Sequence, residues 1–275
     1  MRHTGWSLAG LRFLGRGCCL VLGIAPLLFG CEATTTAGLP MPKKIVDLSP
    51  SITRDLAVRQ FGHRACEFLG LKKEMSFTPV VPENKSYTFG ITSFELVSHL
   101  GAHLDAPGRL LKGGERADQV PLEKLYGRAQ VIDLRWKDRY SALQITDLEQ
   151  YPIEAGQILI LYVGYRQPQD EEWPTYAHLS VEAAQWLATK GIRALATDMP
   201  SIGSFSRYAE LMDKNRPPQE VWAESLAFSQ AGIPVIEGLT NIDGIVDEER
   251  LIFVGFPLAI ADRSGAPLRA AALVF

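Results

Sequence analysis

Short apolar runs alternate with amphipathic segments along most of the chain, and this pattern is typical of an α/β domain. Several of the apolar runs end in a polar residue, as expected of buried strands that lead into a site. The runs predicted to be strands are residues 44–48, 130–134, 157–163, 194–198 and 234–237, and a further strand-rich region begins at residues 255–260.

Two helices follow from the remaining pattern. The first is predicted over residues 180–190, because Ser180 is a suitable N-cap, Gly191 is a typical terminator, and the apolar positions between them repeat at helical spacing. The second is predicted from about residue 218 to residue 230. The intervening residues 199–206 are rich in Ser, Gly and Pro, which predicts a loop.

The first thirty residues have a different pattern. Three arginines and no acidic residue accompany an apolar run over residues 18–29, which is typical of a secretory signal. A buried core helix is the alternative, but the run lacks polar positions at helical spacing. We therefore predict an exported protein organised as a signal peptide over residues 1–30, a flexible linker over residues 31–42 and one domain over residues 43–275.

The end of this signal resembles a bacterial lipobox, because Leu28-Phe29-Gly30 precedes Cys31. Phe29 is bulkier than that motif usually has, and ordinary cleavage nearby is the alternative. A lipidated Cys31 would anchor the protein to a bacterial membrane without spanning it, as a periplasmic lipoprotein. No window after residue 35 is long and apolar enough to predict a membrane-spanning helix.

Composition narrows the classes of function. A chain of 275 residues that is 47% hydrophobic can bury a substantial core. Its net charge of −3 offers no basic surface for phosphates, so we expect no nucleic acid partner. Removal of residues 1–30 leaves two of the four cysteines, Cys31 and Cys66, and no internal disulfide is predicted if Cys31 is lipidated. Cys66 is predicted to be a small buried apolar residue.

The chemistry of the chain is concentrated in residues 98–109, which read SHLGAHLDAPGR. His99, His103 and Asp105 lie close together in this segment. Imidazole nitrogens and a carboxylate suit a borderline divalent cation such as Zn²⁺ or Mn²⁺. A glycine and a proline within the segment favour a strand that enters a loop over a helix. Histidines that only hydrogen-bond in the fold are the alternative interpretation.

The segment resembles the signature of the cyclase or kynurenine formamidase-like family of metal hydrolases, His-x-Gly-Thr-His-x-Asp-x-Pro-x-His. The resemblance continues along nearly the whole chain, through residues 45–49, 156–159, 179–188, 198–201, 236–243 and 266–270. It implies a swivelling β/β/α fold of the α/β class, as one domain with a mixed sheet and flanking helices. It also implies metal-dependent hydrolysis of amide, lactam or lactone bonds in small molecules, aromatic ones included, with kynurenine formamidase-like activity as the nearest expectation.

The resemblance assigns roles residue by residue. His99, His103 and Asp105 match the first metal ligands of the family, and Asp105 would bridge if two ions were bound. Glu237 matches a further ligand. The signature threonine is replaced by Ala102.

Two further departures concern the chemistry itself. Ser225 stands where the family usually has a second imidazole, and serine is a poor zinc ligand, so one ion is expected unless Glu224 or another oxygen donor takes its place. Arg109 stands where the general-base histidine belongs. An arginine stays protonated, but its guanidinium can stabilise an oxyanion or bind a substrate carboxylate, and we predict that catalytic role for it. His178 or Glu237 would then transfer the proton.

Two functions from different classes therefore stay open at this point. The first is an exported metal-dependent amidohydrolase, which the complete set of four ligands favours. The second is a noncatalytic binding lipoprotein, which the two departures favour. The expected partners are a small-molecule substrate, a membrane only through the lipid anchor, and further copies of the chain, because family members are often oligomeric.

Overall fold

The computed structural model describes residues 40–81, 90–166 and 173–275. The predicted signal peptide, Cys31 and the linker up to residue 39 lie outside these residues. The strands are β1 (Lys44–Asp47), β2 (Phe77–Val81), β3 (Ile91–Phe94), β4 (His103–Asp105), β5 (Tyr126–Asp133), β6 (Ala142–Leu143), β7 (Ile158–Tyr162), β8 (His178–Leu179), β9 (Ala194–Thr197), β10 (Val235–Glu237), β11 (Leu251–Pro257) and β12 (Gly265–Val274). The helices are α1 (Leu56–Leu69), α2 (Ile145–Leu148), α3 (Val181–Ala188), α4 (Phe205–Asp213), α5 (Pro218–Val221) and α6 (Ala223–Gln230), with short 3₁₀ turns η1 (Pro107–Arg109), η2 (Leu122–Leu125) and η3 (Ile242–Gly244).

Eight of the described strands form one mixed sheet in the order β1-β12-β11-β5-β7-β9-β10-β4. The central strands β5, β7, β9 and β10 are parallel, and the outer pairs are antiparallel. The long strand β12 also pairs with β4, so the sheet closes on itself. The predicted mixed sheet with flanking helices is therefore confirmed.

The central strands alternate their side chains between two apolar layers. In β7, Ile158 and Ile160 belong to one layer while Leu159 and Leu161 belong to the other, as the twofold period of a strand requires. The layer of Ile158 and Ile160 lies inside the closed sheet and contains many alanines. The other layer is covered by helices, and Leu195 of β9 packs there.

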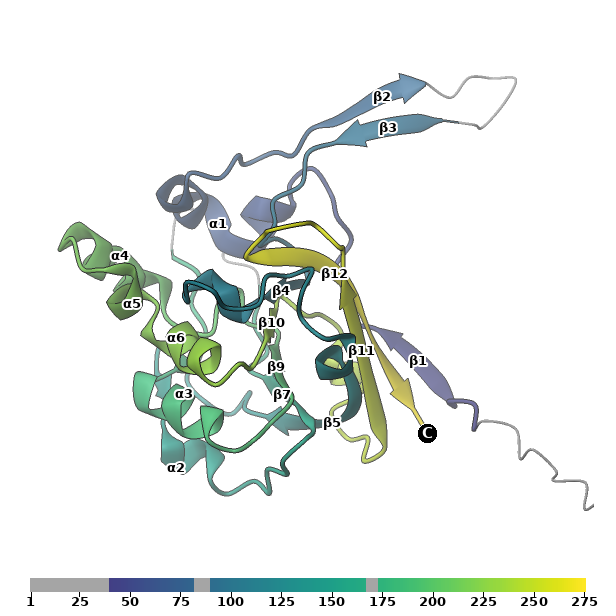
Figure 1. Ribbon diagram of the computed structural model, residues 1–275, viewed down its shortest axis with the longest axis vertical. Coiled ribbons are helices and arrows are strands. Elements are labelled where there is room, and N and C mark those ends of the chain that lie inside the picture. Colours follow the sequence, from purple (N-terminus) through teal and green to yellow (C-terminus); the bar gives the residue numbers. More distant parts are fainter. Residues whose placement is uncertain (1–39, 82–89, 167–172) are drawn as a thin grey trace, which may run out of the picture. The chain divides into compact units, whose positions relative to one another are not determined.

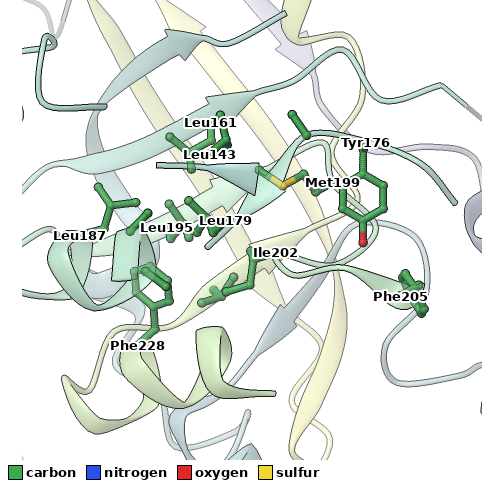
Figure 2. Packing of buried hydrophobic residues seen from close by; sticks show 14 of the residues in the cluster. Leu143, Leu161, Tyr176, Leu179, Leu187, Leu195, Met199, Ile202, Phe205 and Phe228 are labelled. Atoms are coloured by element: carbon green, nitrogen blue, oxygen red, sulfur yellow. The ribbon is translucent and has the colours of Figure 1, made fainter. Parts of the chain in front are cut away.

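Helices α2, α3 and α6 lie beside the outer face of the parallel strands, and α4 and α5 lie farther out (Figure 1). Figure 2 shows Leu187 of α3 and Phe228 of α6 directed toward Leu195 and Leu161 of the sheet. Ser180 caps α3 as predicted, with its hydroxyl accepting the N–H of Ala183. None of the helices in the described parts of the chain is long and apolar enough to cross a membrane.

The other predicted elements are confirmed with two differences. The helix predicted over residues 218–230 is split into α5 and α6 at Trp222, whose backbone is not helical (φ −106°, ψ 46°). The loop predicted over residues 199–206 ends earlier, because Ser204 caps α4 with its hydroxyl. Cys66 is fully buried in α1, and burial raises the pKa of its thiol to about 11, so it behaves as the predicted apolar residue.

Asp198 joins two of the parallel strands at their carboxyl ends. One carboxylate oxygen accepts the N–H of Val163 at 3.0 Å, and the other accepts the N–H of Tyr165 at 2.6 Å. Burial nevertheless raises the pKa of this carboxyl group to about 6. The end of β7 is thus fixed to the end of β9 by an acid that is partly protonated near pH 6.

We expect the contribution of Asp198 to folding stability to fall as the pH rises from about 4 to about 6. The unfolded carboxyl has a pKa of about 3.9, so the folded state binds this proton more tightly. A shift of two units corresponds to ~3 kcal/mol. Denaturant unfolding at several pH values should show wild type losing this amount relative to Asp198→Asn, and a difference that does not change with pH would contradict the prediction.

Gly265, the first residue of β12, has no room for a side chain, because atoms of His99 and Leu104 approach its Cα atom closely. A Cβ atom there would lie 2.6 Å from the carbonyl oxygen of Leu104 and would overlap the ring of His99. We expect Gly265→Ala to lower the free energy of unfolding by about 1–3 kcal/mol, as overpacking usually does. The matched control is Gly244→Ala, whose new methyl group would meet its nearest neighbour at 3.6 Å. Equal unfolding midpoints for the two variants would contradict this account.

Candidate metal centre

Two neighbouring strands place three of the predicted ligands. His103 and Asp105 are two residues apart in β4, so their side chains point to the same face of the sheet. The antiparallel pairing of β4 with β10 sets Glu237 directly opposite His103. All three side chains are buried. Residues distant in sequence are therefore brought together by strand register alone.

His103 is oriented so that one of its ring nitrogens is free to bind a metal ion. Its Nδ1 lies 3.0 Å from the carbonyl oxygen of Gly101, and as an N–H it donates to that oxygen. Its Nε2 then points to the carboxylates, 3.5 Å from Asp105 Oδ1 and 3.5 Å from Glu237 Oε2. A carbonyl that fixes the outer nitrogen of an imidazole is the usual support of a metal-ligating histidine.

His99 approaches the same carboxylate from the turn before β4. Its Nδ1 lies 2.5 Å from Asp105 Oδ1, and its Nε2 lies 3.1 Å from the hydroxyl of Ser264. Burial and the nearby guanidinium of Arg109 hold the pKa of His99 well below its usual range. The ring is therefore neutral near pH 7, which is the form that binds metal ions.

The donor set fits a divalent cation. One ligand atom from each of His99, His103 and Asp105 can be chosen so that all three lie within 4.8 Å of one another. Glu237 adds a second carboxylate beside His103. Two imidazoles and two carboxylates are the ligands that Zn²⁺ and similar borderline ions accept.

Arg109 forms an ion pair with Asp105 Oδ2 inside the site. It lies in η1, which begins two residues after β4 and brings the guanidinium back over the strand. Arg109 therefore lies in the site, but it pairs with Asp105, which is itself a predicted metal ligand. A fixed positive charge already neutralises part of the carboxylate charge that a metal ion would use.

Ser225 and Glu224 lie side by side in α6, and neither replaces the missing imidazole. The hydroxyl of Ser225 is buried and has no hydrogen-bond partner among the described residues. Glu224 is buried too, but its carboxylate pairs with Arg207 at 3.2 Å. The position at which the family resemblance predicts a second imidazole therefore carries only a hydroxyl group.

The site lies on a cavity of about 180 Å³ with an apolar wall. His99, His103, Arg109 and Glu237 line its polar side. The lining also includes aromatic residues of α1, α4 and the break between α5 and α6, namely Phe61, Phe68, Phe205, Tyr208 and Trp222. The motif gave no indication of this wall, because its members come from elements far from residues 98–109 in sequence.

His178 is not brought into this cavity. It lies in the short strand β8, beside β6, and lines a different cavity with Tyr176 and Ser204. Its Nδ1 is 3.3 Å from the carbonyl oxygen of Tyr176. The predicted proton transfer by His178 therefore has no support from its position, because its partners are not those of the metal ligands.

Curated relatives and solved structures are similar to this chain over most of its length. The kynurenine formamidase of Bacillus mycoides is 28% identical over 172 residues, which cover 62% of this chain and 74% of the relative. An isatin hydrolase bound to the product analogue thioisatinate has a TM-score of 0.66 at 17% identity, covering 84% of this chain and 92% of that one.

A third similarity is to a structure of a potential metal-dependent hydrolase with cyclase activity, with a TM-score of 0.62 and 20% identity over 84% of this chain and 98% of that one. These structural similarities confirm the predicted cyclase-like fold. The family model described as "Putative cyclase" matches residues 46–204, which is more than half of the chain. The chain therefore belongs to the Cyclase family.

Proposed function

We propose that this protein is a metal-dependent hydrolase of amide or lactam bonds in small aromatic molecules. The observation that carries the proposal is the convergence of His99, His103 and Asp105, with Glu237 beside them, at the polar side of an aromatic cavity. The related kynurenine formamidase and the similar isatin hydrolase support the same class of substrate.

His99, His103 and Asp105 would hold one divalent cation, and the carboxylate of Glu237 would lie beside it. When bound, such an ion polarises a carbonyl oxygen and lowers the pKa of water from about 15.7 to about 7. One ion is proposed instead of two, because Ser225 offers no imidazole and Arg109 already pairs with Asp105.

The aromatic wall would bind the ring of the substrate and exclude water from the polar side of the cavity. Phe61, Phe205 and Trp222 provide flat apolar surface for this purpose. The scissile carbonyl group would then face Arg109, whose N–H groups not used by Asp105 can donate to the oxygen as negative charge develops there.

Proton transfer is assigned to Glu237. Its Oε1 accepts the backbone N–H of Ile202 at 2.9 Å, which fixes the carboxylate, and its Oε2 faces His103 in the cavity. His178, the other residue predicted for this role, lines a different cavity. Arg109 cannot take the proton, because a guanidinium stays protonated.

The ion pair between Arg109 and Asp105 is also the observation that favours a noncatalytic binding protein. If this pair keeps the cavity closed to an attacking water, the fold would serve to bind a small molecule. The two functions differ in whether the protein turns over any substrate when its metal is present, and the following measurements separate them.

We expect the purified protein to bind one Zn²⁺ or Mn²⁺ ion per chain and to hydrolyse N-formyl aromatic amines or aromatic lactams. His103→Ala should lower metal affinity and kcat/KM by more than about 100-fold, because it removes a buried ligand. Metal content by mass spectrometry and a hydrolysis screen provide the readouts. His63→Ala, an exposed histidine of α1, is the matched control.

Two outcomes would contradict the proposal in different ways. Hydrolysis that His103→Ala leaves unaffected would remove the proposed mechanism. Stoichiometric metal with no turnover on any substrate would favour the binding protein.

We expect Arg109→Gln to have opposite effects on metal binding and on turnover. Removing a positive charge beside Asp105 should raise metal affinity by about tenfold or more. The loss of a donor to the developing oxyanion should lower kcat by about 100-fold at saturating metal. Titration calorimetry and steady-state kinetics measure the two effects, with the exposed Arg128→Gln as control. A variant with weaker metal binding would show that Arg109 helps to assemble the site.

A further inference from the structure

A second cavity, of about 340 Å³, contains none of the candidate metal ligands. It lies between the middle of α1, the segment around residue 140, the strand β8 with the residues before it, and the start of α4. The side chains on which the inference depends are Arg64, Arg139, Trp173, His178, Ser204 and Ser206.

The two arginines of this cavity are stacked on aromatic rings. The guanidinium of Arg64 lies 4.7 Å from the ring centre of Trp173, and that of Arg139 lies 4.8 Å from the ring centre of Tyr140. Arg139 also donates one N–H to the hydroxyl of Tyr140 at 2.6 Å. The remaining N–H donors at the edge of a stacked guanidinium suit the two oxygens of a carboxylate. Within residues 40–81, 90–166 and 173–275, neither guanidinium has a carboxylate within 4.0 Å.

The described part of the cavity lining is positively charged. It includes two arginines and no acidic residue among residues 40–81, 90–166 and 173–275, whereas the whole chain has a net charge of −3. The hydroxyls of Ser204 and Ser206 lie 2.9 Å apart at the same wall and add further hydrogen-bonding groups. Two positive groups gathered in one hollow attract an anion.

His178 adds no positive charge to this lining at neutral pH. Burial, together with the nearby charge of Arg207, lowers the pKa of its ring below the usual value. The attraction for an anion therefore comes from Arg64 and Arg139.

The volume of the cavity indicates an organic ligand. Pockets for small organic molecules usually measure about 300–1,000 Å³, so 340 Å³ is at the small end of this range and larger than an inorganic ion needs. We propose that this cavity binds a small organic carboxylate with roughly one ring, whose carboxylate group is held by Arg64 and Arg139.

The proposed site adjoins the metal cavity but does not depend on it. Trp173 packs edge-on against Phe68 with ring centres 5.4 Å apart, and Phe68 lines the metal cavity. Because carboxylates also bind metal ions, the test uses metal-free protein. A negative result in the hydrolysis experiments would therefore not contradict the proposed carboxylate site.

Titration calorimetry of the purified, metal-free full chain with benzoate and with its neutral counterpart benzamide tests the proposal. Benzoate should bind, and benzamide should bind at least about tenfold more weakly. Arg64→Gln and Arg139→Gln should each weaken benzoate binding by about tenfold or more, because each removes a charged hydrogen-bond donor. His178→Gln should retain binding. The matched control is Arg59→Gln, an arginine of α1 that does not line the cavity.

Three results would overturn the inference. They are equal binding of benzoate and benzamide, undiminished benzoate binding by a double variant Arg64→Gln/Arg139→Gln with a native circular dichroism spectrum, and tighter binding of inorganic phosphate than of benzoate. The last result would show that the cavity takes an inorganic ion.

Discussion

The pairing of β4 on both of its edges is the constraint on which the site depends. This strand has three residues, yet it is hydrogen-bonded to β10 on one side and to β12 on the other, so it closes the sheet. A strand fixed on both edges cannot shift its register without turning every side chain to the opposite face. Leu104 therefore stays in the inner layer, and His103 and Asp105 stay beneath the helices with Glu237 opposite.

Electrostatics then determines which cations can compensate the buried carboxylates of this fixed arrangement. Buried carboxylates are costly unless a cation compensates them. Asp105 has Arg109 as such a cation, and Glu237 has a backbone N–H and the imidazole of His103 nearby. The chain thus carries one permanent positive charge where the family resemblance predicts a histidine base. In the proposed function, the position of this charge would affect both the binding of a metal ion and the stabilisation of an oxyanion.

The sequence predicted what depends on local pattern and on the family motif. The cap at Ser180, the buried strands and the grouping of His99, His103 and Asp105 could all be read from neighbouring residues. The break at Trp222 could not, because nothing in the spacing of residues 218–230 shows that its ring packs against Tyr208 at the cavity. The cavity that His178 lines could not be predicted for a similar reason. Its strand is two residues long, and its pairing with β6 decides which cavity it lines.

The inner layer of the closed sheet has a consequence for how this chain can diverge. Ala194, Ala196, Ala266 and Ala270 are all fully buried there, and the strands around them are bonded to one another on all sides. A larger side chain at any of these positions would overlap its neighbours, since adding a methyl group to a close-packed interior causes strain. Larger side chains are therefore accommodated more easily on the helical side of the sheet than in this inner layer. Arg109 in η1 and Ser225 in α6, the two residues that depart from the chemistry predicted by the family resemblance, both lie outside the strands of this inner layer.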